Sequence, residues 1–165
     1  PAHGRRQAAR GAGRGGRSAL ARPFRRGRGL DGRRCGGCGF CRGGRTVYLM
    51  SAASKDLGAG VMFYGSGTMV PFGEGPAPFD RTRGIGCPIQ GHFGANGQNP
   101  SPGDMRKLDA ELTKFGKTHE FHTYGDAAHA FCNTGSANYR PHAAALSWPK
   151  ATEFFSRHLV EGKSA

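Results

Sequence analysis

A cysteine flanked by glycines is the residue of this sequence best suited to nucleophilic chemistry. Cys41 lies in Gly39-Phe40-Cys41-Arg42-Gly43, a G-x-C-x-G pattern followed by a helical pattern. A thiol on a sharp turn between a strand and a helix lies at the helix N-terminus, where the helix dipole favours a thiolate. We expect side chains two positions before and after it to collide with neighbouring elements, and the backbone N–H of Arg42 to point at a developing oxyanion. The pattern predicts Cys41 as a nucleophile and Arg42 as a backbone oxyanion donor.

A histidine far downstream is the candidate general base. In α/β-hydrolases, which build this kind of turn around a serine, the chain order is nucleophile, acid, histidine. His129 lies in a predicted loop after the last predicted strand, where such a histidine belongs. His119 and His122 fall on opposite faces of that strand, and His92 falls at a strand end, which indicates structural roles. We expect His129 to take the proton of Cys41.

Three cysteines favour a competing interpretation, a metal site. Cys35, Cys38 and Cys41 have the spacing of a zinc or iron–sulfur ligand run. Such a run needs a fourth ligand, and Gly44 occupies the position three residues after Cys41. The remaining cysteines are explained by a strand and a loop, so we predict no metal.

The elements that must position these residues alternate along the chain. Residues 41–53 read as a helix, and the apolar runs 59–64 and 87–93 read as buried strands, followed by a third strand at 119–124. The clearest helix starts after Ser101, with Pro102 at its first position and an apolar face of period 3–4, and it ends at Gly116. A last helix spans residues 141–160, and Pro149 should kink or split it. This alternation predicts an α/β architecture with a mostly parallel sheet flanked by helices.

The positive charge of the chain is concentrated at one end. The sequence has 165 residues and a net charge of +13. Residues 1–45 hold 13 of the 24 Lys and Arg residues and a single acid, so the remainder is nearly neutral. Residues 1–34 are Arg/Gly-rich without apolar periodicity, which predicts an irregular or disordered tail. Such a tail can contact nucleic acid nonspecifically, and a non-catalytic nucleic-acid-binding chain is our alternative function. No apolar run is long enough to span a bilayer, and the cysteine pattern favours a reducing, cytoplasmic location.

At these residues the chain resembles the dienelactone hydrolase (carboxymethylenebutenolidase) family. The resemblance covers about residues 39–160 and looks like the C-terminal part of that fold. It rests on the following stretches: Gly39-Phe40-Cys41-Arg42-Gly43-Gly44-Arg45, Phe63-Tyr64-Gly65, Cys87-Pro88-Ile89 with His92-Phe93-Gly94, Asn99-Pro100-Ser101-Pro102, His119-Glu120-Phe121-His122 and Ala128-His129-Ala130-Phe131. The resemblance implies a partial α/β-hydrolase fold, an ester hydrolase that opens small lactones or related esters through Cys41 and His129, and no cofactor.

The sequence departs from the family pattern at three points. The position of the family's acid is Gly97, which has no side chain, and the adjacent Asn96 is the candidate substitute. The residues before Gly39 contain no apolar strand, and the family's N-terminal half has no counterpart. We therefore expect weak activity or none. We also expect two parts, a disordered or out-of-frame segment at residues 1–38 and the hydrolase-like part at residues 39–165.

Overall fold

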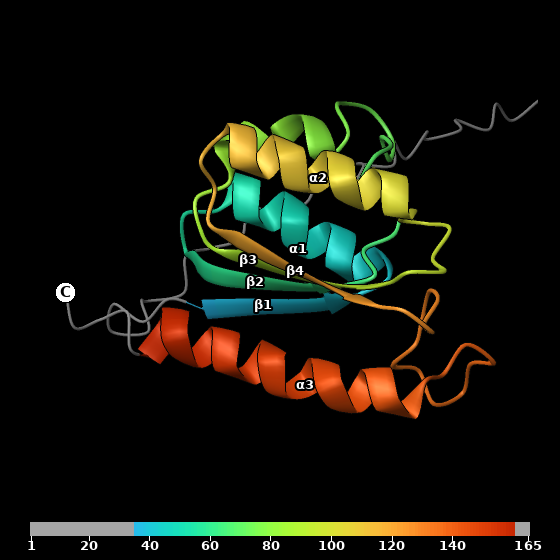
Figure 1. The fold of residues 1–165 in the computed structure, drawn as a ribbon. Helices are drawn as coiled ribbons and strands as arrows, with labels where there is room; N and C mark the ends of the chain where they lie inside the picture. The colour runs from blue at the N-terminus through green and yellow to red at the C-terminus, as the bar shows by residue number, and fades with distance from the viewer. Residues whose placement is uncertain (1–34, 161–165) are drawn as a thin grey trace, which may run out of the picture. The chain divides into compact units, whose positions relative to one another are not determined.

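Residues 35–160 of the chain are described by a computed structural model, and they form a four-stranded sheet flanked by helices (Figure 1). The strands are all parallel and lie in the order β1-β2-β3-β4. The predictions for residues 1–34 fall outside this part of the chain. The elements are β1 (Cys35–Phe40), α1 (Arg42–Ala53), β2 (Leu57–Phe63), the 3₁₀ helix η1 (Phe79–Gly84), β3 (Ile89–Gly94), α2 (Pro102–Lys114), β4 (His119–Tyr124), α3 (Pro141–Phe155) and the π-helical turn η2 (Ser156–Val160).

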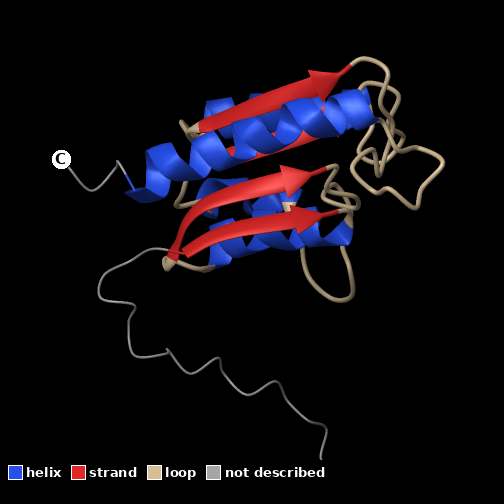
Figure 2. Ribbon diagram, turned by 90° about the horizontal axis from the view of Figure 1, so that it is seen from below, coloured by secondary structure: helices blue, strands red, loops and turns tan. Residues whose placement is uncertain are grey.

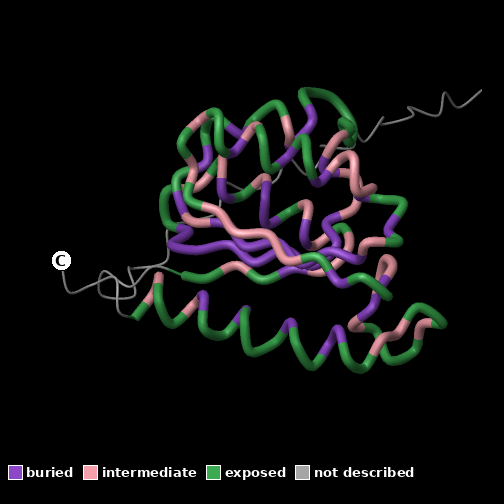
Figure 3. The backbone as a smooth tube through the Cα atoms, viewed as in Figure 1, coloured by how far each residue is buried: buried purple, intermediate pink, exposed green. Residues whose placement is uncertain are grey.

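Helices α1 and α2 cover one face of the sheet, and α3 covers the other (Figure 1). Strands β2 and β3 are buried along their whole length, because helices cover both faces of the sheet (Figure 3). Successive residues of a strand point to opposite faces. Along β2, Val61 and Phe63 accordingly pack in a cluster with Phe154 of α3, whereas Met62 packs in a cluster with Leu108 of α2. The predicted α/β class is confirmed.

Strand β1 corrects our expectation that no strand precedes the nucleophile. Cys35–Phe40 pairs in parallel with β2 although it contains three glycines and no Val, Ile or Leu. The packing supplies what the side chains lack. A Cβ on Gly36 would lie 2.7 Å from Phe155 and 2.8 Å from Leu159, and one on Gly37 would lie 3.2 Å from Leu57. Large side chains of neighbouring elements therefore lie against this strand, although Cys35, Gly36 and Cys38 stay exposed. Strand β1 also spans the boundary between the two predicted parts of the chain, residues 1–38 and 39–165. The division into these parts stays a prediction.

The capping signals in the sequence predicted the position of α2 correctly. Its N-cap Ser101 accepts a hydrogen bond from the Asp104 N–H at 3.1 Å, and the Asp104 carboxylate accepts one from the Ser101 N–H at 3.0 Å. This reciprocal pair is a capping box, which satisfies N–H groups that have no partner inside the helix. Gly116 follows the helix with φ of +61°, the left-handed conformation that glycine adopts readily.

Helix α3 continues through Pro149, so the predicted split does not occur. Its buried face includes Ala144 and Ser147 before the proline and Ala151 and Phe154 after it. Packing against the sheet on both sides of Pro149 keeps the helix continuous, despite the backbone hydrogen bond that the proline cannot donate.

All four strands point the same way, and their carboxyl ends meet loops at one edge of the sheet (Figure 2). The loops that follow β1, β2, β3 and β4 carry Cys41, Ser66, Asn99 and His129 respectively. Ligands of open α/β sheets bind at this edge, which makes it the place to look for a site.

Candidate active site

Cys41 occupies a strained turn between β1 and α1. Its φ of 53° and ψ of −120° are unusual for a residue with a side chain. A Cβ on Gly39 would press on the Gly43 carbonyl and lie 2.8 Å from the Gly44 nitrogen, so this approach requires glycine. A Cβ on Gly44 would lie 2.9 Å from the Cα of Gly65, whereas one on Gly43 would meet nothing within 4 Å. The predicted collision two residues after the cysteine is therefore wrong, and the crowded position is one residue further on.

Backbone hydrogen bonds fix the turn to the end of β2 and to the loop that follows it. The Cys41 N–H donates to the Phe63 carbonyl at 3.1 Å, and the Cys41 carbonyl accepts from the Ser66 N–H at 3.1 Å. Arg42 is the first residue of α1, so its N–H has no acceptor inside the helix. Its guanidinium lies 5.5 Å from the ring centre of Phe72, an exposed residue of the same loop.

The structure brings Cys41 and His129 into contact. His129 Nε2 lies 3.1 Å from Cys41 Sγ, across 88 positions of sequence. The Tyr64 ring packs edge-on against the imidazole at 5.0 Å between centres. A base within this distance of a thiol can take its proton directly.

The second imidazole nitrogen has a partner that the sequence analysis missed. His129 Nδ1 lies 3.0 Å from the backbone carbonyl oxygen of Asn99. A carbonyl only accepts hydrogen bonds, so Nδ1 carries the proton and donates it. Nε2 is then left with a lone pair directed at the Cys41 thiol, the tautomer that a general base requires. The stretch Asn99-Pro100-Ser101-Pro102 was recognisable in the sequence, but no side-chain signal marks a backbone carbonyl as a partner.

The position of the family's acid is filled by backbone. A Cβ on Gly97 would lie 3.0 Å from the carbonyl oxygens of both Gly94 and Pro100. The Asn96 amide donates to the Gly125 carbonyl at 3.4 Å, so the structure directs it away from the imidazole of His129. Neither residue provides the acid's contact with the histidine.

Burial affects the charge of the Cys41 side chain. It raises the pKa of the Cys41 thiol above its ordinary value of 9.0. We expected the helix N-terminus to favour the thiolate, but desolvation opposes the charged form and decides the direction. At neutral pH the thiol is therefore protonated, and its reactivity depends on a neighbouring base.

A hollow of about 400 Å³ opens beside His129. Its walls carry carboxamide and hydroxyl groups and no charged side chain. The lining residues are Ser66, Asn96, Gln98, Asn99, Ala128, His129 and Asn138. A small polar molecule could enter here and reach the imidazole.

The competing metal site does not assemble. Within residues 35–160, no group of three or more His, Cys, Asp or Glu side chains is placed to hold a metal ion. Cys35 and Cys38 lie three residues apart on β1, so their side chains point to opposite faces of the strand.

No helix within residues 35–160 is long and apolar enough to cross a membrane.

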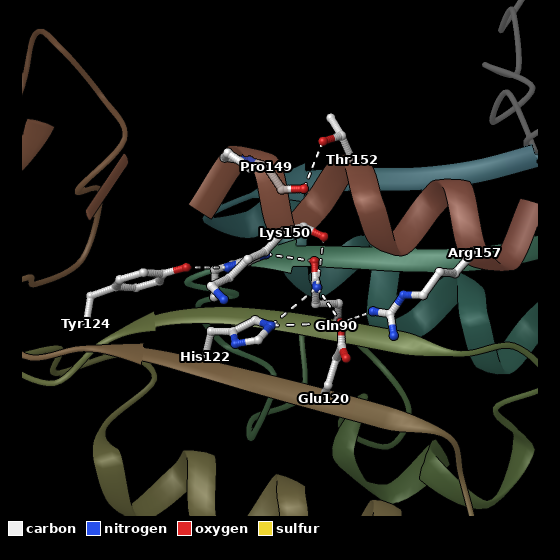
Figure 4. A network of polar contacts seen from close by, with 9 residues as sticks. Gln90, Glu120, His122, Tyr124, Pro149, Lys150, Thr152 and Arg157 are labelled. Carbon is white, nitrogen blue, oxygen red and sulfur yellow. Dashed lines mark hydrogen bonds and ion pairs between the residues drawn. The ribbon is translucent and has the colours of Figure 1, made fainter. Parts of the chain in front are cut away.

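His92, which is fully buried, belongs to a polar network between β3, β4 and α3 (Figure 4). Tyr124 donates its hydroxyl proton to His92 Nδ1 at 2.9 Å, and His92 Nε2 donates to Gln90 Oε1 at 2.8 Å. Gln90 Nε2 then donates to Glu120 at 2.6 Å and to the Lys150 carbonyl at 3.2 Å. Burial, followed by the nearby charges of His122 and Lys150, lowers the pKa of His92 to about 3. This histidine is therefore a neutral structural link, as the sequence indicated.

Comparison with known proteins decides the family. The model of the dienelactone hydrolase family matches residues 10–159. The chain belongs to this family. The family match starts at residue 10, whereas the resemblance seen in the sequence started at Gly39. A match over most of the chain does not favour the alternative function, a non-catalytic nucleic-acid-binding chain.

Individual relatives agree with this assignment. The chain is 29% identical over 135 residues to a "Putative carboxymethylenebutenolidase" of Methylorubrum extorquens, covering 79% of this chain and 45% of that protein. It is 31% identical over 125 residues to the protein of that name in Escherichia coli K12, covering 73% and 45%. The crystal structure of a "Putative Dienelactone Hydrolase" from Klebsiella pneumoniae superposes with a TM-score of 0.68 at 27% identity, covering 73% of this chain and 50% of that one. This dienelactone hydrolase family member thus spans about half the length of the curated relatives that it matches.

Proposed function

We propose that the chain carries the nucleophile and base of a thiol hydrolase that cleaves the ester bond of lactones or related small esters. The observation that carries the proposal is the 3.1 Å contact between Cys41 Sγ and His129 Nε2 on a glycine-bounded turn. Membership in the dienelactone hydrolase family supports the reaction class. Cys41 is the nucleophile, His129 the general base and the Arg42 N–H an oxyanion donor.

The first half of the reaction makes an acyl-enzyme. His129 Nε2 takes the thiol proton as Cys41 Sγ attacks the carbonyl carbon, and the carbonyl oxygen becomes an oxyanion. The Arg42 N–H stabilises this oxygen. When the intermediate collapses, the carbon–oxygen bond breaks and the leaving alkoxide takes the proton from His129. In a lactone this alcohol stays attached to the acyl group.

The second half regenerates the thiol. His129 removes a proton from a water molecule, which attacks the thioester carbon. The carbon–sulfur bond breaks, the carboxylic acid leaves, and Cys41 regains its proton. Every proton in this cycle passes through His129 Nε2, and no step needs a metal or an organic cofactor.

Two features support low activity in this chain. The thiol is protonated at rest because burial raises its pKa, and the partner of His129 is a neutral carbonyl rather than a carboxylate. Free thiols are found at Cys35, Cys38, Cys41 and Cys132. They support our prediction of a reducing, cytoplasmic compartment.

The test is hydrolysis of p-nitrophenyl acetate by the chain and by Cys41→Ala and His129→Ala. We expect either substitution to remove on the order of 10² or more of the rate above background. Mass spectrometry should show one acetyl group on Cys41 after rapid quenching. Cys35→Ala is the matched control, because Cys35 is an exposed thiol on the strand before the turn. Equal rates for the chain and Cys41→Ala would contradict the proposal.

A further inference from the structure

Asn99 connects the loop that follows β2 to the histidine loop. Its side-chain Oδ1 accepts a hydrogen bond from the Gly67 N–H at 2.8 Å. Its backbone carbonyl accepts one from His129 Nδ1 at 3.0 Å. The adjacent Ser66 N–H donates to the Cys41 carbonyl, and His129 Nε2 contacts the Cys41 thiol. These contacts close a ring that contains both proposed reacting groups.

We infer that Asn99 is the positioning residue that replaces the family's acid, with its main-chain carbonyl as the acceptor for His129. The inference rests on the proposed function and adds to it the group that orients the base. Asn99 touches no reacting atom. It acts through the imidazole, whose tautomer and direction it sets.

The side chain and the main chain of Asn99 have separate tasks. The Gly67 contact holds the residue in place, because a backbone N–H is fixed by the loop to which it belongs. The carbonyl then faces Nδ1 from a fixed position. Removing the side-chain acceptor leaves the carbonyl chemically intact but unanchored, and a misplacement of about 1 Å can cost about 10²-fold in rate.

The substitution of a carbonyl for a carboxylate has a chemical consequence. Both groups accept the Nδ1 proton and therefore select the same tautomer. Only the carboxylate carries a full charge, and hydrogen bonds to a charged group are roughly twice as strong. Asn99 can therefore orient the base, but it stabilises the imidazolium less than an acid would. We therefore expect correct geometry of the base but low activity.

The neighbouring candidates do not meet these requirements. Gly97 has no side chain, and the two carbonyl oxygens beside it leave 3.0 Å for a Cβ. Asn96 directs its amide to Gly125, although it lines the same hollow as Asn99. Of these three residues, the structure places only Asn99 in contact with both His129 and another loop of the site.

The experiment measures how fast iodoacetamide alkylates Cys41 from about pH 6 to about pH 10, with the Cys41→Ala chain subtracted. Near neutral pH the reaction requires proton removal by His129, whereas at high pH the thiol ionises unaided. We expect Asn99→Ala to lower the neutral-pH rate about 10-fold or more, towards that of His129→Ala. The high-pH rate should not change. Asn99→Asp keeps the acceptor oxygen for Gly67 and should restore most of the neutral-pH rate.

Asn133→Ala is the matched control. Asn133 Oδ1 also accepts a loop N–H, that of Gly135 at 3.0 Å, but it lies outside the hollow. Its alkylation profile should match that of the unsubstituted chain. If Asn99→Ala matches it too while His129→Ala is slow, the proposed function stands and the Asn99 inference fails. A loss at Asn96→Ala without one at Asn99→Ala overturns the inference in favour of Asn96. If His129→Ala itself has no effect, the proposed function fails.

Nitrogen NMR of the unsubstituted chain gives a test that requires no variant at Asn99. The inference expects a protonated Nδ1 and an unprotonated Nε2 on His129 near neutral pH. The opposite tautomer would overturn it. This measurement also decides the matter if Asn99→Ala does not fold.

Discussion

The two glycines of the G-x-C-x-G motif should respond in opposite ways to the same substitution. In Gly39→Ala, the new methyl group would press on the Gly43 carbonyl and lie 2.8 Å from the Gly44 nitrogen. Both neighbours belong to the backbone at the start of α1 and cannot rotate away. In Gly43→Ala, the methyl group would meet nothing within 4 Å, and the φ of Gly43 lies outside the left-handed region.

The expected free energies follow from these contacts. Forcing a methyl group into a packed site costs about 1–3 kcal/mol, and the rigid backbone around Gly39 places the cost at the upper end, about 3 kcal/mol. Gly43→Ala should instead stabilise the chain by about 0.4–1 kcal/mol, because alanine restricts the unfolded chain and suits a helix. The two variants should therefore differ by about 3–4 kcal/mol in free energy of unfolding.

Urea unfolding measures this difference. Trp148 is the only tryptophan, and its ring centre lies 5.8 Å from that of Phe40, the residue before Cys41, so its fluorescence reports on this region. With a slope of about 1–3 kcal/mol per molar urea, Gly39→Ala should lower the midpoint by on the order of 1 M or more. Gly43→Ala should raise it by a few tenths of a molar. Equal destabilisation by both variants would refute the reasoning and restore the symmetric interpretation of the motif.

Three further predictions concern other parts of the chain. The pKa of His92 falls from 6.5 to about 3 on folding. Between these two values the unfolded chain binds more protons than the folded chain, so the free energy of unfolding should decrease as the pH is lowered, by up to about 1.4 kcal/mol per pH unit. His92→Gln should flatten the dependence, as measured by urea midpoints near pH 7 and pH 4.5. Gly97→Asp should not raise the rate of ester hydrolysis, because its carboxylate would be built against the carbonyl oxygens of Gly94 and Pro100; a higher rate would show that the acid position is still usable. Ser101→Ala removes the N-cap of α2 and should cost about 1 kcal/mol in thermal or urea unfolding; no change would show that the cap is redundant.

The glycine-bounded turn and the second helix illustrate what short-range signals can establish. Ser101 and Gly116 mark the ends of α2 because a cap and a left-handed residue act within one helical turn. The turn at Cys41 was predictable for the same reason. Gly39 lies close to the start of the helix, and the residues in contact are at most five positions apart. Strand β4 was predicted at its observed bounds from its pattern alone.

Strand β1 shows where such signals fail. Its sequence predicts no strand, because glycine contributes neither apolar surface nor β propensity. The strand forms because β2 pairs with its backbone, while the side chains of Phe155 and Leu159, more than 100 positions away, lie against Gly36. A pattern of side chains within one segment cannot reveal contacts that come from another.

The sequence by itself determined the turn around Cys41, the α/β alternation and the position of His129 in the loop after the last strand. Only the tertiary structure decided which group faces His129 Nδ1. The sequence analysis looked for a side chain, at Gly97 or Asn96, because residue types are all that a sequence displays. The group found there is the Asn99 carbonyl, which every residue possesses. Its role arises from position alone, and that position is set by a hydrogen bond to Gly67, 32 residues earlier in the chain.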